Sequence, residues 1–223
     1  SGDVELRSVA VTGGQFGVVV SGASLEMEGV WIHHTGAFGL ALQSDVGAPV
    51  VHADNVLIEQ GVIGGAQVYG GDLTLERSSI RDILVDAAGQ SAGGLVGYPA
   101  ANAASKITVR GTQLDRNAGV GLGVFGSEVV AEDIVVRDTQ PGTSTGIGII
   151  VTEYNGPASL TLSGSVLERN LELGMFVRGA TAHVERTVVR QSKTAGIGYG
   201  GGIGSEQFAG MPSQLTVLRS LVD

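Results

Sequence analysis

Three acidic residues follow the same short apolar motif at three places in the chain. Glu28, Asp54 and Glu76 each come one position after an apolar–x–apolar triplet, and Glu26 lies beside the first of them. If the triplets form neighbouring parallel strands, the carboxylates face outward on one sheet about 5 Å apart. Carboxylates at that separation can bind calcium or act as the pair of a retaining glycosidase, and those two strands apart approach the inverting distance. The three residues are therefore the candidate catalytic or calcium-binding group.

A simpler interpretation of the acidic run is a solvated face with balanced charge. Arg7 and Arg110 flank the run, and Arg77 is adjacent to Glu76. Any ladder of stacked strands produces the same spacing, so spacing alone does not indicate catalysis. We expect no required cofactor, with calcium as the one candidate.

Aromatic residues form the second candidate group. Tyr98, Tyr154, Tyr199 and Phe208 lie in or beside long segments of irregular sequence. A row of loops that carries spaced aromatic rings could hold an extended polymer such as a polysaccharide. The alternative is that loops simply tolerate variation in length and that tyrosine is common at half-exposed sites.

Other chemistries lack the residues that they need. His33 and His34 are adjacent and would point to opposite faces of a strand. The chain has no cysteine, no phosphate-binding loop and no nucleophile elbow. Its net charge of −9 argues against nucleic-acid binding. No run of about 18 apolar residues is present, so we expect no membrane span.

A repeat of one structural unit positions all these residues. The pattern apolar–x–apolar, two polar residues, small, x, apolar recurs nine times, with its second apolar residue at positions 6, 27, 53, 75, 109, 131, 162, 184 and 217. The spacings by subtraction are 21, 26, 22, 34, 22, 31, 22 and 33. The short spacing fits one turn of a three-sided parallel β-helix.

Each unit also contains a glycine-led apolar strand, as at 17–20, 39–42, 121–124, 146–149 and 174–177. Alternation with period two and the lack of a 3.6-residue period exclude helices. The sequence therefore predicts an all-β fold, a single-stranded right-handed parallel β-helix of about nine coils. Long segments on alternate coils should emerge along one edge. They are 43–49, 97–104 (with an insertion at 85–91), 152–157 and 200–213.

The coil pattern resembles the right-handed parallel β-helix of the pectate-lyase-like superfamily. Residues 162–170 followed by 174–177 show it well, and it covers nearly the whole chain. The resemblance implies the fold, and it implies that acidic sheet residues can bind calcium as they do in pectate lyases. The pectate lyase arginine motif and the polygalacturonase aspartates are not found. Residues 196–205 have glycines of the polygalacturonase type but no histidine, so no catalytic residue is carried over.

Charges alternate from coil to coil at two positions. The first column runs Glu59, Arg81, Asp115, Arg137, Glu168 and Arg190, and the next residue gives Asp82, Arg116, Asp138 and Arg169 in the opposite phase. Opposite charges would then stack on neighbouring coils and disfavour a slip by one coil. Together with the loop lengths, this pattern predicts a duplicated two-coil unit of about 54 residues; coincidence in a short column is the alternative.

One turn position, eight residues past the anchor, carries short polar side chains. They are Thr35, Asn117, Thr139, Asn170 and Ser192. We interpret them as structural, because such side chains cap exposed backbone at turns and can hydrogen-bond between stacked coils.

These features lead to three functional hypotheses. The first is a non-catalytic extracellular or cell-surface scaffold that binds glycan or protein through its loop edge. The second is a polysaccharide lyase or glycoside hydrolase acting on an acidic polysaccharide, and the third is a structural spacer or assembly subunit. We expect residues 1–223 to form one β-helix domain of a longer chain, because both ends lack caps, and uncapped coils could associate end to end.

Overall fold

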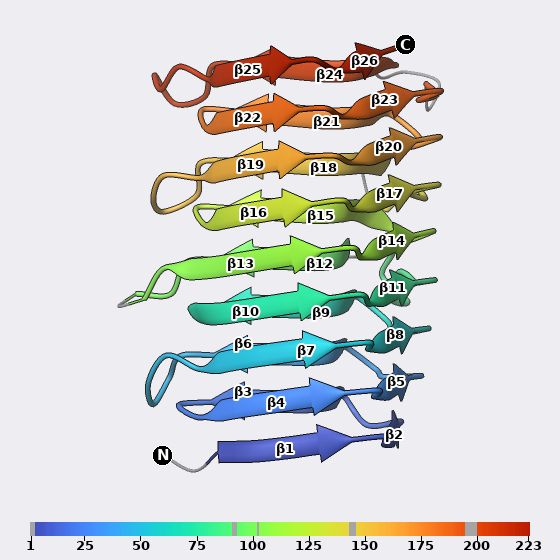
Figure 1. Cartoon of the computed structure of the whole chain (residues 1–223), viewed down its shortest axis with the longest axis vertical. Helices are drawn as coiled ribbons and strands as arrows, with labels where there is room; N and C mark the ends of the chain where they lie inside the picture. Colours follow the sequence, from blue (N-terminus) through green and yellow to red (C-terminus); the bar gives the residue numbers. More distant parts are fainter. Residues whose placement is uncertain (1–2, 91–92, 102, 143–145, 195–199) are drawn as a thin grey trace.

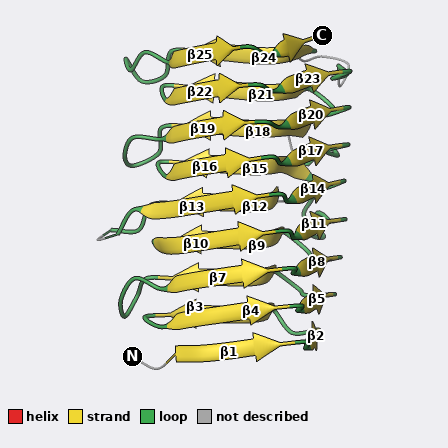
Figure 2. Ribbon diagram, in the orientation of Figure 1, coloured by secondary structure: helices red, strands yellow, loops and turns green. Residues whose placement is uncertain are grey.

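The computed structural model describes residues 3–90, 93–101, 103–142, 146–194 and 200–223. These residues form a stack of coils in which every regular element is a β-strand. Each coil contributes one strand to each of three parallel sheets, and every strand pairs with the strand three places along the chain (Figures 1 and 2). The predicted nine-coil parallel β-helix is confirmed. The described residues contain no helix that is long and apolar enough to cross a membrane.

Sheets A and B each have nine strands, and sheet C has eight. Sheet A contains β1 (Asp3–Arg7), β4 (Ser24–Glu28), β7 (Val50–Asp54), β10 (Gly71–Glu76), β13 (Ser105–Arg110), β16 (Glu128–Glu132), β19 (Ser159–Ser163), β22 (Thr181–Glu185) and β25 (Gln214–Leu218). Sheet B contains β2 (Ala10–Thr12), β5 (Trp31–His33), β8 (Leu57–Glu59), β11 (Ser79–Arg81), β14 (Gln113–Asp115), β17 (Val135–Arg137), β20 (Val166–Glu168), β23 (Val188–Arg190) and β26 (Leu221–Val222). Sheet C contains β3 (Phe16–Ser21), β6 (Phe38–Gln43), β9 (Gly64–Tyr69), β12 (Gly93–Tyr98), β15 (Gly119–Phe125), β18 (Gly146–Thr152), β21 (Leu173–Arg178) and β24 (Gly201–Glu206).

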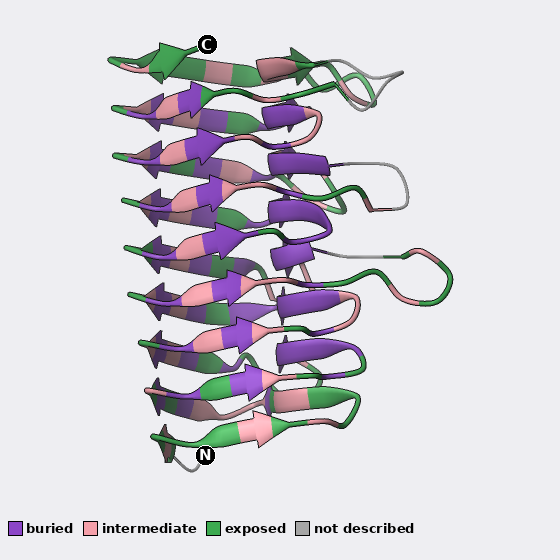
Figure 3. Ribbon diagram, turned by 90° about the vertical axis from the view of Figure 1, so that its right-hand side faces the viewer, coloured by how far each residue is buried: buried purple, intermediate pink, exposed green. Residues whose placement is uncertain are grey.

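An aliphatic column fills the interior. Val51, Leu73 and Ile107 stack in register on sheet A, and each is at least 98% buried. Alternation along the strands of sheets A and B turns one set of side chains inward and leaves the other more exposed, whereas the central strands of sheet C are buried almost throughout (Figure 3). Burial at about 25 cal/mol per Å² of apolar surface makes this column the main source of stability.

Long loops between sheets C and A occur on alternate coils, as predicted, and line one edge of the stack (Figure 1). Their bounds differ from the sequence expectation. Strand β24 occupies 201–206, so the last loop begins after it, and Gly97, Tyr98 and Thr152 belong to strands. The insertion predicted at 85–91 lies elsewhere: its described residues, 85–90, follow sheet B and precede sheet C. The strands are longer than expected because their last residues still pair in register with the neighbouring coil, as Tyr98 does with Tyr69 and Thr152 with Phe125.

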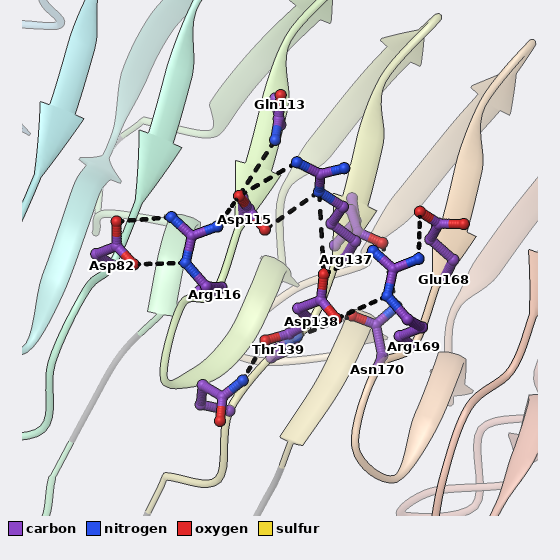
Figure 4. Close-up of polar contacts among 12 residues, drawn as sticks. Asp82, Gln113, Asp115, Arg116, Arg137, Asp138, Thr139, Glu168, Arg169 and Asn170 are labelled. Carbon is purple, nitrogen blue, oxygen red and sulfur yellow. Dashed lines mark hydrogen bonds and ion pairs between the residues drawn. The ribbon is translucent and has the colours of Figure 1, made fainter.

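Ion pairs of the two charge columns link every pair of neighbouring coils from the third to the eighth. The first column pairs Arg81 with Glu59 at 2.7 Å, Arg137 with Asp115 at 3.2 Å and Arg190 with Glu168 at 2.7 Å. The second column pairs Arg116 with Asp82 at 2.7 Å and Arg169 with Asp138 at 2.8 Å, across the intervening boundaries (Figure 4). The predicted alternation is confirmed.

Asn117, Thr139 and Asn170 of the polar turn column are buried and hydrogen-bonded between coils, whereas the hydroxyls of Thr35 and Ser192 have no hydrogen-bond partner among the residues that the structure describes. Asn170 is fully buried, donates to the carbonyl of Val136 at 3.2 Å and accepts from the Thr139 hydroxyl at 2.6 Å. Asn117 donates to Ile80 at 2.9 Å in the same manner. The structural interpretation of these two asparagines is therefore confirmed.

Candidate functional site

The acidic residues predicted to be neighbours are stacked in register. Glu28 pairs with Asp54, and Asp54 with Glu76, at the ends of strands β4, β7 and β10 of sheet A. Their side chains point outward because each follows an inward-facing residue. They line or adjoin a shallow hollow of about 210 Å³ over the first three coils, which also contains Glu5, Glu26 and His52.

Arginines pair with all three carboxylates. Arg7 contacts Glu28, Arg77 contacts Asp54, and Arg110 lies 3.4 Å from Glu76. His52 Nε2 lies 4.0 Å from Glu76. No group of three or more histidine or acidic side chains that could hold a metal is present in the residues described. This arrangement agrees with the balanced-charge interpretation, while one oxygen of Asp54 is buried without a hydrogen-bond partner.

The prediction that His33 and His34 point to opposite faces is wrong. Their Nδ1 atoms lie 2.7 Å apart, and the His33 ring stacks on Trp31 with centroids 4.0 Å apart. Strand β5 ends at His33, and His34 has a left-handed backbone with φ of 55°. A residue in that conformation no longer follows strand alternation.

The loop edge brings two of the predicted aromatic residues together. Tyr98 ends strand β12, and its ring packs edge-on against Tyr154 with centroids 5.8 Å apart. On its other side Tyr98 stacks on Phe125, with centroids 4.8 Å apart and planes 7° apart. Burial raises the pKa of the Tyr98 hydroxyl, and the neighbouring Tyr154 adds to the rise. The hydroxyl therefore stays protonated and able to donate.

The other predicted aromatic residues do not join this group. Phe208 lies further along the edge, under the guanidinium of Arg178, whose carbon is 3.8 Å from the ring centroid. Arg178 also pairs with Glu206 at 2.9 Å. Tyr199 lies outside the described residues.

Two aromatic residues of the edge were missed from the sequence. Tyr69 pairs in register with Tyr98 and is 41% exposed, and Phe125 follows on the next coil. Both end a glycine-led strand, at the same position as Tyr98. That shared position is the sequence signal that identifies them. It lies at strand ends and not in the long loops, where the aromatic candidates were sought.

Two notches lie along the loop edge, and residues that directly follow Tyr98, Phe125 and Tyr154 in the chain line the first of them. The first, of about 420 Å³, lies between the loops of coils four and six over the short turn of coil five; its lining includes Pro99, Ala101, Ser127, Glu128, Asn155 and Ser159. The second, of about 360 Å³, lies between the loops of coils six and eight over the short turn of coil seven; its lining includes Glu153, Pro157, Gly179, Thr181, Met211 and Gln214. The residues Gly156 and Pro157 of coil six line both notches.

The notches and the acidic ladder occupy opposite margins of sheet A. Ser159 and Thr181 begin their strands, whereas Glu28, Asp54 and Glu76 end theirs. Four residues of strand separate the two margins, which is about 13 Å. The two groups are therefore separate candidate sites.

Comparisons with known proteins give the fold and no closer relationship. No protein-family model and no curated protein matches the chain. Among solved structures, pectate lyase Pel9A superposes with a TM-score of 0.58 at 14% identity over 92% of this chain. The catalytic unit of a thermostable GH87 alpha-1,3-glucanase from Streptomyces thermodiastaticus strain HF3-3 gives a TM-score of 0.63 at 16% identity over 94%. The chain spans 55% and 43% of the length of these two proteins, and it shares their right-handed parallel β-helix.

Proposed function

We propose that the chain binds an extended polysaccharide along its loop edge, as the β-helix of a carbohydrate-active protein outside the cell or at its surface. The observation that carries this proposal is the pair of equivalent notches between the long loops of the edge that also holds the Tyr98, Phe125 and Tyr154 rings. Fold similarity to a polysaccharide lyase and a glucanase supports a carbohydrate-active protein more than a scaffold without any such role.

The charge of the chain favours a neutral polymer. The net charge is −9, and Glu128 and Glu153 line the notches. Like charges would repel an acidic polysaccharide at this edge. Small apolar side chains and hydroxyl or amide groups suit the mixed surface of a neutral sugar.

Affinity electrophoresis tests the proposal with neutral glucans and with polygalacturonate. We expect the protein to be retarded by a neutral glucan and not by polygalacturonate. Tyr154→Ala, which removes a ring that is 48% exposed, should weaken binding about ten-fold, the effect of losing about 1.4 kcal/mol. Trp31→Ala removes an aromatic side chain of similar exposure on sheet B and serves as the control. Binding to no polysaccharide, or equal loss in both variants, would reject the loop edge as the site.

Cleavage at the acidic ladder is a second candidate function, supported by the register of Glu28, Asp54 and Glu76. Hydrolysis would release reducing sugars, and elimination would release unsaturated oligosaccharides in a calcium-dependent reaction. Asp54→Asn should abolish either product while leaving binding at the loop edge unchanged, because about 13 Å separates the two margins. Full activity in that variant would exclude the ladder as the reaction site.

A further inference from the structure

The two notches of the loop edge are equivalent by the repeat of the chain. Each has a short turn as its floor and a long loop on either side. They are displaced by two coils, which is about 9.6 Å along the axis for strands about 4.8 Å apart. A ligand that occupies both must present the same group at that interval.

Glycine in the short turns lets a neighbouring long loop pack directly against each turn. Gly126 and Gly179 have φ of 52° and 57°. A Cβ at Gly126 would overlap the carbonyl oxygen of Tyr154, and one at Gly179 would lie 3.1 Å from Cβ of Phe208. The same device recurs at Gly70, where a Cβ would lie 2.9 Å from Ala100. The two-coil period is therefore built into the whole edge.

We infer, on the basis of the proposed function, that the loop edge recognises a neutral polysaccharide in an extended ribbon whose repeat is two sugars. In such a ribbon, which 1,4-linked chains with equatorial bonds adopt, every second sugar presents the same face. Two sugars advance by nearly the distance of two coils, so alternate sugars enter successive notches. Chains that coil, such as β-1,3-glucans, cannot keep this alignment.

Polar groups in the notches favour a sugar over a peptide as occupant. Ser127, Asn155 and Ser159 line the first notch, and Thr181 and Gln214 line the second. These side chains can donate to and accept from hydroxyl groups. A polyproline chain, which advances about 9.3 Å per three residues, also fits the interval but has no donors of its own.

Calorimetric titration with cello-oligosaccharides of two to six sugars tests the inference. Affinity should rise about ten-fold from two sugars to three, the length at which alternate sugars can fill both notches, and should change little with further sugars. Laminarin oligosaccharides of equal length should bind more weakly and without steps. A smooth rise with length, or equal binding of laminarin, would overturn the two-sugar repeat while leaving polysaccharide binding intact. Binding of a polyproline peptide in place of any glycan would overturn both proposals.

A filled notch gives an independent test. Ser159→Trp places an indole in the first notch and should weaken the six-sugar ligand about ten-fold but the two-sugar ligand only about two-fold, because the second notch remains open. Thr161→Trp is the matched control, since Thr161 faces outward on the same strand away from the notch. Melting temperatures of both variants report folding. Equal loss for short and long ligands in Ser159→Trp would contradict occupation of two notches by one chain.

Discussion

At the residue scale, the ion pairs of the two charge columns lie at the ends of the sheet B strands and in the turns that follow them. Asp138 has a lowered pKa, chiefly because Arg169 donates hydrogen bonds to it, and Glu168 has a lowered pKa chiefly because Arg190 does so. Asp115 lies between Arg116 and Arg137 and is almost fully buried. Each exposed pair contributes about 1 kcal/mol or less to the free energy of unfolding. The columns therefore affect stability through the number of pairs and coil register through their positions.

The pH dependence of stability follows from these lowered pKa values. A carboxyl group whose pKa is lower in the folded state stabilises the protein above its unfolded pKa of about 4, and this stabilisation is lost as the pH falls through the folded value. We expect the melting temperature to be level between about pH 7 and pH 5 and to fall below about pH 4. Arg169→Gln should make that acid fall shallower, because Asp138 loses its main hydrogen-bond donor.

Arg186→Gln is the control for this measurement. Arg186 is exposed and pairs with Glu185, outside the charge columns. Scanning calorimetry or circular dichroism at several pH values compares the three proteins. An unchanged acid slope in Arg169→Gln would show that the lowered pKa of Asp138 has another source.

At the element scale, the short turns between sheets C and A depend on glycine for two separable reasons. Gly126 has φ of 52°, which strains any residue with a Cβ, and its turn is also covered by Tyr154 and Pro99. Gly13, in the turn from sheet B to sheet C of the first coil, has φ of 76°, but a Cβ there would meet nothing within 4 Å. Comparison of the two positions therefore separates backbone strain from close packing.

Gly126→Ala should destabilise the protein by about 3 kcal/mol or more, whereas Gly13→Ala should cost about 1 kcal/mol, the strain of a left-handed residue alone. The close approach to Tyr154 accounts for the difference, because the loop of coil six must move away. Denaturant midpoints provide the comparison. Equal midpoints would show that the loop of coil six moves away at little cost in free energy. This wall of the first notch would then not be held rigidly.

At the scale of the whole molecule, two features of the chain repeat every second coil. Loop length alternates along the edge, and the charge columns alternate with the same period. Val109, Ala131 and Leu162 are equivalent inward residues on three successive coils. The chain can therefore be shortened at these points without changing strand register.

Two deletions test whether the unit is one coil or two. Removal of 110–162 takes out 53 residues and joins Val109 to Ser163, so that Arg81 meets Glu168 and long loops still alternate with short ones. Removal of 110–131 takes out 22 residues and places Arg81 against Arg137 and one long loop against another. The protein that lacks 110–162 keeps less apolar core. We nevertheless expect its melting temperature to lie at least about 5 °C above that of the protein that lacks 110–131.

The opposite order of melting temperatures would mean that core size outweighs register, and the two-coil unit would then be a feature of sequence history alone. Melting curves recorded at low and high salt refine the comparison. The gap between the two deletions should narrow at high salt, since salt screens the like charges of the single-coil deletion.

The sequence by itself determined the β-helix, its nine coils, the alternation of loops and the stacked charges. These features repeat once or twice per turn, and side-chain alternation with period two fixes which residues enter the core. It also predicted that Glu28, Asp54 and Glu76 would stack, since their positions relative to the repeat are the same.

Only the tertiary structure decided which side chains meet where the repeat is broken. The contact of Tyr98 with Tyr154, the separate position of Phe208 and the meeting of His33 with His34 depend on loop paths and left-handed turns. The notches likewise arise from loops on different coils that pack around a glycine turn. The loop contacts join residues far apart in sequence without a shared period, and the contact of the two histidines depends on one left-handed residue, so strand alternation specifies neither.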